Sequence, residues 1–260
     1  MGIGASAPIV KEVPYSRTDA TLYYFGGRGL ADQIRWMLAY TDVSYTQRVV
    51  GTRDRFVNLK DSGQLPFGQL PLLQIDGLEL VQSQAIIRYL ARRANLTGND
   101  AQEELMCDML AETILDLIKM ATAAPFLRNQ SEEAGKAHIA TMREKWFLQA
   151  TRMEMCIERN TKLKLKGGIG GGGKEKGKTA CLVGAGVTYA DVLLAHCLTW
   201  YVEECGADIV SDMPLLTEIQ YAVLSKPSLQ AFLGGKQFYP IGDAAYCEQV
   251  ATVLARPIGK

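Results

Sequence analysis

The chain has 260 residues, which is long enough to bury the core of one large domain or of two smaller ones. Its 28 lysine and arginine residues balance 28 aspartate and glutamate residues, so no overall charge favours nucleic acid or an anionic membrane as a partner. The apolar stretches are shorter than the roughly 20 residues that a membrane span needs, and we expect a cytoplasmic protein.

Residues 1–19 are expected to form a flexible extension. The stretch Met1-Gly2-Ile3-Gly4-Ala5-Ser6 matches the pattern for N-myristoylation at Gly2. One acyl chain anchors a protein only marginally, and Lys11 and Arg17 are too sparse to form a polybasic second signal. We therefore expect no stable membrane association from this segment.

The segment 20–94 alternates strand and helix signals. Residues 20–25 favour a strand, and the apolar residues after the glycines have the spacing of a helix face: Leu30, Ile34, Met37 and Leu38. A second strand is expected at 44–49, followed by an exposed loop over 51–64, with or without one helical turn.

A hairpin and a helix complete this segment. Strands at 70–75 and 78–81 flank Asp76-Gly77, a strong hairpin signal. Ser83 is expected to cap a helix that continues to about Ala94. The order of these elements predicts a small α/β domain over 20–94.

The rest of the chain is predicted to be helical. A polar linker at 95–100 precedes helices at about 101–128, 132–160, 188–205 and 212–225, which gives an all-helical domain over 101–260. A Gly/Lys-rich insertion at about 162–178 satisfies G-x-G-x-x-G at 168–173. Glu175 stands where a P-loop needs Ser or Thr, and no apolar strand precedes it, so we interpret the insertion as a flexible surface loop.

The thiols and imidazoles indicate no metal site. The six cysteines form no C-x-x-C pair, and His138 and His196 have no cysteine or carboxylate at ligand spacing. Free, mostly buried thiols in a reducing compartment are the simplest interpretation.

Three features of 20–94 each allow two interpretations. Tyr24 ends a strand before a glycine loop, where its phenol either packs in the core or donates a hydrogen bond to an anion. Leu70-Pro71 either begins a strand in the trans form, or is cis and offers the Leu70 backbone to an extended peptide. Gln82-Ser83 either caps a helix or holds a carboxylate at its N-terminus.

Taken together, these motifs resemble the glutathione S-transferase family, and most closely its sigma class, which includes glutathione-dependent prostaglandin D synthases. The resemblance covers about residues 20–260. The segments that carry it are Tyr24-Phe25, Arg28-Gly29, Pro66-Phe67-Gly68-Gln69-Leu70-Pro71, Asp76-Gly77, and Gln82 to Leu90. Thr188-Tyr189-Ala190-Asp191 also looks like the family's capping box at the start of a buried helix.

The resemblance implies a thioredoxin-like domain that binds glutathione, followed by an all-α domain that completes a pocket for a hydrophobic electrophile. Tyr24 would donate its O–H to the glutathione sulfur and lower a thiol pKa that is about 8.5 in free cysteine. The glutathione contacts implied by the resemblance are Phe25, Phe56, Lys60, Gln69, Leu70, Pro71, Gln82 and Ser83.

The resemblance also implies roles at a dimer interface and in the electrophile pocket. Asp116 has two interpretations: in a homodimer it would reach the glutathione bound by the neighbouring subunit, and otherwise it is a solvated acid on a helix. Leu30, Met120 and Phe126 would line the electrophile pocket, although apolar residues at helical spacing are more often core. Leu30 replaces a basic residue of several sigma members, which weakens the case for a substrate that bears a carboxylate.

The expected function is therefore a glutathione transferase. The alternatives are a glutathione-dependent isomerase and a non-enzymatic ligand-binding or structural member of the family, since fold alone does not fix function. A thiol exchanger would need a cysteine at the Tyr24 loop, and the chain has none there.

Overall fold

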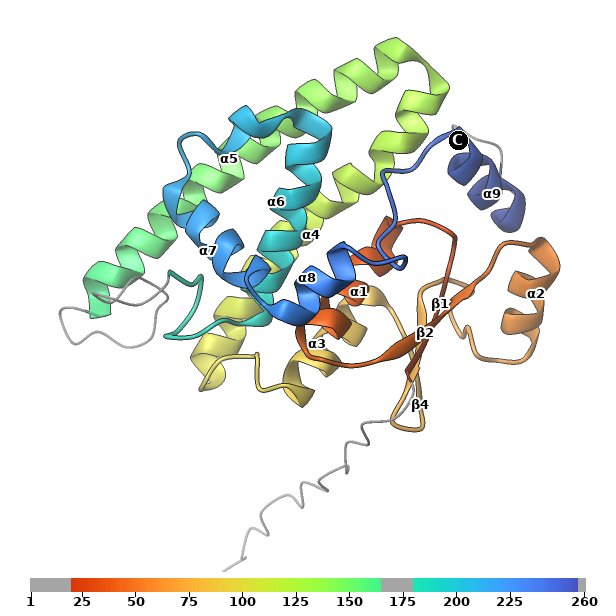
Figure 1. The fold of residues 1–260 in the computed structure, drawn as a ribbon, viewed down its shortest axis with the longest axis horizontal. Helices are drawn as coiled ribbons and strands as arrows, with labels where there is room; N and C mark the ends of the chain where they lie inside the picture. Colours follow the sequence, from red (N-terminus) through yellow and green to blue (C-terminus); the bar gives the residue numbers. More distant parts are fainter. Residues whose placement is uncertain (1–19, 165–179, 257–260) are drawn as a thin grey trace, which may run out of the picture.

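The computed structural model describes residues 20–164 and 180–256. The N-terminal extension with Gly2, and residues 165–178 of the glycine-lysine insertion, lie outside the described residues. Figure 1 shows an α/β unit joined to a larger group of helices. The predicted fold class, a thioredoxin-like domain followed by an all-α domain, is confirmed.

The α/β unit is built on a four-stranded sheet with the order β2-β1-β3-β4. The strands are β1 (Ala20–Tyr24), β2 (Tyr45–Val49), β3 (Leu72–Ile75) and β4 (Leu78–Val81). β1 pairs with β2 in parallel and with β3 antiparallel. Asp76 and Gly77 have φ angles of 52° and 74°, so the predicted hairpin turn between β3 and β4 is confirmed.

Three helices accompany the sheet: α1 (Asp32–Tyr40), α2 (Arg53–Asp61) and α3 (Ser83–Arg93). A short 3-10 turn, η1 (Gly29–Ala31), leads into α1. The expected loop at 51–64 was wrong, because α2 has nine residues. Thr52 caps this helix by accepting from the Arg55 N–H at 3.3 Å, and only Phe56 and Leu59 are buried, so the apolar signal was too weak to reveal it.

The expected N-cap of α3 was also wrong by one position. Gln82 occupies the N-cap and Ser83 is the first helical residue. Gln82 has a φ of 68°, a left-handed conformation that is uncommon for a residue with a side chain.

The second unit holds six α-helices within the described residues: α4 (Ala101–Gln130), α5 (Glu132–Lys164), α6 (Tyr189–Cys205), α7 (Pro214–Leu224), α8 (Pro227–Leu233) and α9 (Ala244–Leu254). A 3-10 turn, η2 (Ala207–Val210), follows α6. The long helices α4 and α5 pack along each other, and α6 packs between α4 and α7 with most of its side chains buried (Figure 1). No described helix is long and apolar enough to cross a membrane.

The two units meet along α1, whose residues from Asp32 to Leu38 are all buried. α1 packs against α3 of the first unit and against α6 and α8 of the second. His196 of α6 lies 3.1 Å from Asp32 through its Nε2 atom. Arg28 Nη1 contacts Glu203 at 2.5 Å, and Arg28 Nε donates to the Tyr239 carbonyl at 2.7 Å, so Arg28 ties the glycine loop to the helical unit.

The start of α6 carries the expected capping box. The Asp191 carboxylate accepts from the Thr188 N–H and from the Leu182 N–H, both at 2.7 Å. Burial raises the pKa of Asp191 to about 6, although these hydrogen bonds act in the opposite direction. The cap therefore fixes the loop before α6 as well as the helix itself.

We predict that Asp191→Asn lowers the free energy of unfolding by about 1–3 kcal/mol at pH 7, because a buried N–H would lose its acceptor. A raised folded-state pKa adds stability below the unfolded-state pKa and loses it as pH rises through about 6. The deficit of Asp191→Asn should therefore grow by about 1 kcal/mol between pH 7 and pH 5.

Urea unfolding at the two pH values measures this difference. Asp116→Asn is the control, since Asp116 is an exposed acid of α4. A deficit that shrinks on acidification would contradict the assigned pKa shift.

Candidate active site

Tyr24 lies at the end of β1 with 6% of its surface exposed. Its hydroxyl oxygen accepts a hydrogen bond from the Leu30 N–H at 3.0 Å. Among the described residues, no acceptor takes the hydrogen of the Tyr24 hydroxyl. Burial raises the pKa of Tyr24, while the Leu30 hydrogen bond and the Arg35 charge offset part of the rise. The phenol is therefore protonated at neutral pH and has one hydrogen to donate.

The glycine loop is shaped around this phenol. Gly29 has a φ of 45°, and a Cβ atom added there would lie 2.3 Å from the Tyr24 hydroxyl oxygen. A Cβ atom at Gly27 would lie 2.4 Å from the Tyr246 ring of α9. The loop can approach both rings only because these two positions have no side chain.

Arg35 of α1 holds the glycine loop, residues 26–29, through hydrogen bonds to its backbone. This arginine is fully buried, and its Nη1 atom donates to the carbonyl of Gly27 at 3.0 Å and to that of Arg28 at 3.3 Å. Its guanidinium carbon is 5.9 Å from the centre of the Tyr24 ring. A positive charge thus lies beside the phenol. Sequence reasoning missed this residue, although an arginine between the apolar residues Ile34 and Trp36 was a usable signal.

Asp32 partly balances that charge. Burial alone would raise the pKa of Asp32, but the hydrogen bond from His196 and the charges of Arg35 and Arg28 outweigh it and hold the pKa below its usual value. Asp32 is therefore a buried carboxylate at neutral pH, and it links the loop to α6.

Strand register places the three predicted motifs in one row. Tyr23 is opposite Leu72, and Leu72 is opposite Val81. One position further toward the same edge of the sheet, Tyr24 follows Tyr23, Pro71 precedes Leu72, and Gln82 follows Val81. These three residues therefore lie side by side. Neighbouring strands are about 4.8 Å apart, so this row spans about 10 Å.

Pro71 and Gln82, the central member of the row and one outer member, have distinctive geometry. The Leu70–Pro71 bond is cis, one of the two alternatives that the sequence left open. The Gln82 amide nitrogen lies 3.4 Å from the Gln69 side-chain oxygen, which brings these two predicted residues together. Ser83 is buried at the start of α3, where the helix N-terminus favours an anion.

Other predicted residues have packing roles in the structure. The Phe25 ring is 6% exposed and meets the Tyr24 ring edge to face at 5.0 Å. The Phe56 ring is 4% exposed, and the Lys60 ammonium lies 5.9 Å from its centre. Lys60 itself is exposed beside Gly68. Direct contact of Phe25 or Phe56 with a ligand stays a prediction.

The predicted electrophile residues come from two elements. Leu30 lies in η1, and Met120 and Phe126 lie on α4, which contacts η1. All three side chains are half-buried. The Phe126 ring is 5.9 Å from the Tyr246 ring, so α9 brings a further aromatic residue to this side of the glycine loop. Sequence reasoning missed Tyr246, because a short helix so far from Tyr24 in the chain gives no signal of its position.

Asp116 is a solvated acid in the single chain. It lies on α4, its side chain is 78% exposed, and it pairs with Lys119 at 3.1 Å. Its proposed reach toward a neighbouring subunit stays a prediction.

The site has no features of a metal centre. Within the part of the chain that the structure describes, no group of three or more histidine, cysteine, aspartate or glutamate side chains could hold a metal ion. The polar groups that the described residues bring to this part of the structure are the Tyr24 phenol, the buried Arg35 guanidinium and the N-terminus of α3.

Comparison with known proteins decides the family. Residues 20–92 match the model of the glutathione S-transferase N-terminal domain, and residues 122–236 match the model of the C-terminal domain. The chain belongs to the glutathione S-transferase family. It is 36% identical to glutathione S-transferase A4 of Mus musculus over 90% of this chain and 96% of that protein. The same figures hold for glutathione S-transferase alpha-4 of Rattus norvegicus.

Two solved structures agree with this family. NaGST-2 is 30% identical, with a TM-score of 0.62 over 84% of this chain and 97% of its own. A prostaglandin synthase D of Nilaparvata lugens has a TM-score of 0.64 over 86% of this chain and 100% of its own, at 24% identity, which shows the fold alone.

The predicted likeness to the sigma class is not supported, since the curated relatives carry alpha-class names. Most of the motifs behind that prediction contain residues that were assigned to glutathione itself. A co-substrate that the whole family shares cannot separate one class from another.

We predict that Gly29→Ala lowers the free energy of unfolding by about 1–3 kcal/mol, because the new Cβ atom needs a left-handed backbone and overlaps the Tyr24 hydroxyl. Gly186→Ala is the control, since Gly186 has open space around it. Urea unfolding of both variants measures the difference. Equal stability of Gly29→Ala and wild type would contradict the described packing of the loop.

Proposed function

We propose that this member of the family is a glutathione transferase in which Tyr24 stabilises the glutathione thiolate for attack on hydrophobic electrophiles. The observation that supports it most is the Tyr24 hydroxyl, whose oxygen accepts from the Leu30 N–H. Its own hydrogen is left for a ligand at the edge of the sheet where Pro71 and Gln82 also lie.

The thiolate is the nucleophile, and a thiol with a pKa of about 8.5 is only a few per cent ionised at pH 7. A hydrogen bond from Tyr24 to the sulfur favours the charged form, and the Arg35 guanidinium favours it further. Lowering the thiol pKa by about two units requires about 2.7 kcal/mol, which a charge-assisted hydrogen bond in a partly dry site supplies. The sulfur then bonds to the electrophilic carbon as the leaving group departs.

The row of motifs supports an extended peptide as the ligand. The Leu70 backbone would pair with the cysteinyl residue, and the γ-glutamyl carboxylate would lie at the start of α3, near Gln82 and Ser83. Lys60 and Gln69 would contact the glycyl end. Because the Phe56 ring is covered, it supports Lys60 more directly than it supports the ligand.

The electrophile would lie on the other side of the sulfur, against Leu30, Met120, Phe126 and Tyr246. These side chains make an apolar surface, which fits hydrophobic electrophiles. Leu30 supplies no charge for a substrate carboxylate. The structural likeness to a prostaglandin synthase concerns the fold alone, so it does not favour the isomerase alternative.

We predict that Tyr24→Phe lowers the turnover of 1-chloro-2,4-dinitrobenzene by about 10- to 100-fold, since the thiolate loses about 1.4–2.7 kcal/mol of stabilisation. Glutathione affinity should change far less, because the backbone and carboxylate contacts remain. Tyr23→Phe is the control, since the Tyr23 hydroxyl donates to Gln74 at 3.1 Å and lies outside the site. Full turnover by Tyr24→Phe would contradict the assigned role, and binding without turnover in wild type would favour a non-enzymatic protein.

A homodimer and a cytoplasmic location are further parts of the proposal. Exposed apolar side chains support the dimer, because large apolar patches on a protein surface often mark a contact with a partner. They include Phe67 before β3, Leu78 of β4, and Leu105 and Met109 of α4, which are 66%, 41%, 60% and 63% exposed. In the dimer, Asp116 would reach the glutathione amine of the neighbouring subunit.

We predict that the wild-type chain sediments as a dimer, and that Leu105→Glu with Met109→Glu yields folded monomers, because two carboxylates cannot be buried unpaired. Met155→Glu is the control, because Met155 is 63% exposed on α5. Analytical ultracentrifugation gives the result. A monomeric wild type would remove both the dimer and the proposed role of Asp116.

A further inference from the structure

The stretch of α4 that carries Met120 and Phe126 is interrupted by a proline. Pro125 is buried inside this helix, directly before Phe126. A proline within a helix has no N–H to donate, so the carbonyl four residues earlier, that of Ala121, loses its usual helical partner. The helix is therefore less supported by its own hydrogen bonds at the turn that holds these two side chains.

His138 of the next helix, α5, contacts this turn. Its Nε2 atom lies 2.8 Å from the Met120 carbonyl oxygen. A carbonyl can only accept, so Nε2 carries a hydrogen and donates it. His138 is half-buried, so water competes less for this hydrogen bond than at an exposed position. α5 thus supplies a hydrogen bond that ties α4 at the turn before Pro125.

The packing of α5 on α4 presents His138 to that turn. Gly135 and His138 are three residues apart, so they lie on the same face of α5. A Cβ atom at Gly135 would lie 3.0 Å from the Arg128 Cα atom of α4, so the two backbones approach closely there. One face of α5 therefore holds α4 before and after Pro125, at Met120 and at Arg128.

The same stretch of α4 borders the candidate active site. The Phe126 ring lies 5.9 Å from the Tyr246 ring of α9, and a Cβ atom at Gly27 of the glycine loop would overlap that tyrosine. A shift of this stretch of α4 would therefore widen or narrow the apolar space beside Tyr24.

We propose that His138 is a positioning residue for the hydrophobic electrophile, because its hydrogen bond to the Met120 carbonyl fixes the α4 wall of the electrophile pocket. This inference rests on the proposed function, in which Met120 and Phe126 line that pocket. His138 acts through Met120 and contacts neither the thiolate nor the electrophile. The proposed glutathione contacts within one chain all come from the α/β unit, so they do not depend on His138.

The physical effect is a change in how often the wall has the right position. Without the hydrogen bond, the turn before Pro125 has several arrangements, and only some of them accommodate the electrophile. The apparent affinity for the electrophile then falls by the fraction of the protein that has the binding arrangement. The affinity for the peptide part of glutathione stays the same.

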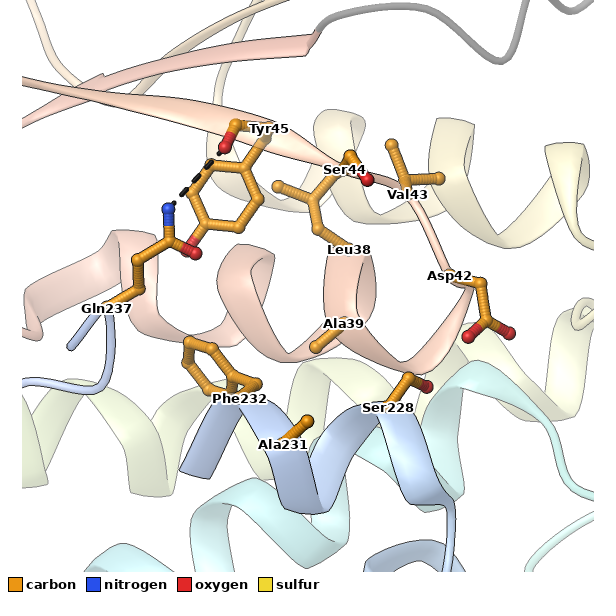
Figure 2. Close-up of a pocket in the computed structure, with 10 residues that line it drawn as sticks. All are labelled: Leu38, Ala39, Asp42, Val43, Ser44, Tyr45, Ser228, Ala231, Phe232 and Gln237. Atoms are coloured by element: carbon orange, nitrogen blue, oxygen red, sulfur yellow. Dashed lines mark hydrogen bonds between the residues drawn. The ribbon is translucent and has the colours of Figure 1, made fainter. Parts of the chain in front are cut away.

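The hollow that Figure 2 shows between α1 and α8 is a different part of the molecule. None of the described residues that line it belongs to α4 or α5. An apolar group bound in that hollow would not respond to a change at His138. An effect of His138 on binding therefore reports the α4 wall.

The test compares S-hexylglutathione with S-methylglutathione, which share the peptide and differ only in the alkyl chain that enters the electrophile pocket. Isothermal titration calorimetry on the full chain gives both affinities. His138→Leu removes the donor, and His138→Gln keeps an N–H at a similar distance from the backbone. Thr141→Val is the matched control, since Thr141 is exposed on α5 and its hydroxyl donates to the Ala137 carbonyl at 3.0 Å.

We expect His138→Leu to weaken S-hexylglutathione binding by about three- to tenfold, which is the range of one net hydrogen bond, and S-methylglutathione binding by less than about twofold. His138→Gln and Thr141→Val should bind both compounds within about twofold of wild type. A general loss of folding would weaken both compounds alike, so the ratio of the two affinities separates positioning from stability.

An unchanged ratio in His138→Leu, equal losses for both compounds, or failure of His138→Gln to restore the ratio would overturn the proposal. A wild type that binds both compounds without turnover would contradict the transferase and leave the role of His138 intact. A wild type that binds neither compound would contradict the proposed function and this inference together.

Discussion

The hydrogen bond from the Leu30 N–H to the Tyr24 hydroxyl determines what the phenol can do. A hydroxyl oxygen that already accepts from the backbone is oriented, and its hydrogen points elsewhere. The bond exists because Gly29 adopts a left-handed φ and has no Cβ atom to overlap the ring. Burial keeps the pKa of this tyrosine high, so the group acts as a donor and not as a base. The proposed thiolate chemistry depends on this local geometry.

The helical unit is part of the same arrangement. Tyr246 of α9 packs on Gly27, and the Gly26 N–H donates to Gln249 of α9 at 2.9 Å. Arg28 contacts Glu203, and Asp32 contacts His196. The glycine loop is therefore held by Arg35 of α1 and by two helices of the second unit, α6 and α9. Because α1 is buried along most of its length between the two units, a change in their packing would move the loop and with it the Leu30 N–H.

Much of the fold was predictable because its signals are local. Asp76-Gly77 specified the hairpin, and Thr188 with Asp191 specified the cap of α6. The helix α2 was missed because it buries only Phe56 and Leu59 in a charged segment, and Ser83 was misplaced because the N-cap is a left-handed Gln82. At the site, the row of Tyr24, Pro71 and Gln82 follows from strands whose motifs were visible in the sequence. Arg35 had a local signal that was overlooked, but the place of Tyr246 depends on contacts between distant segments, which a single sequence does not encode in any short pattern. The class within the family was missed for another reason, since the motifs used for it concern a shared co-substrate.

The most direct test of the central claim is the pH titration of the ultraviolet absorbance of glutathione thiolate bound to the wild-type chain and to Tyr24→Phe. The account predicts that the bound thiol titrates about two pH units below free glutathione in the wild type, and close to free glutathione in the variant. A bound thiol that titrates at the free value in the wild type, or equally low in both proteins, would contradict the role assigned to the Tyr24 hydroxyl.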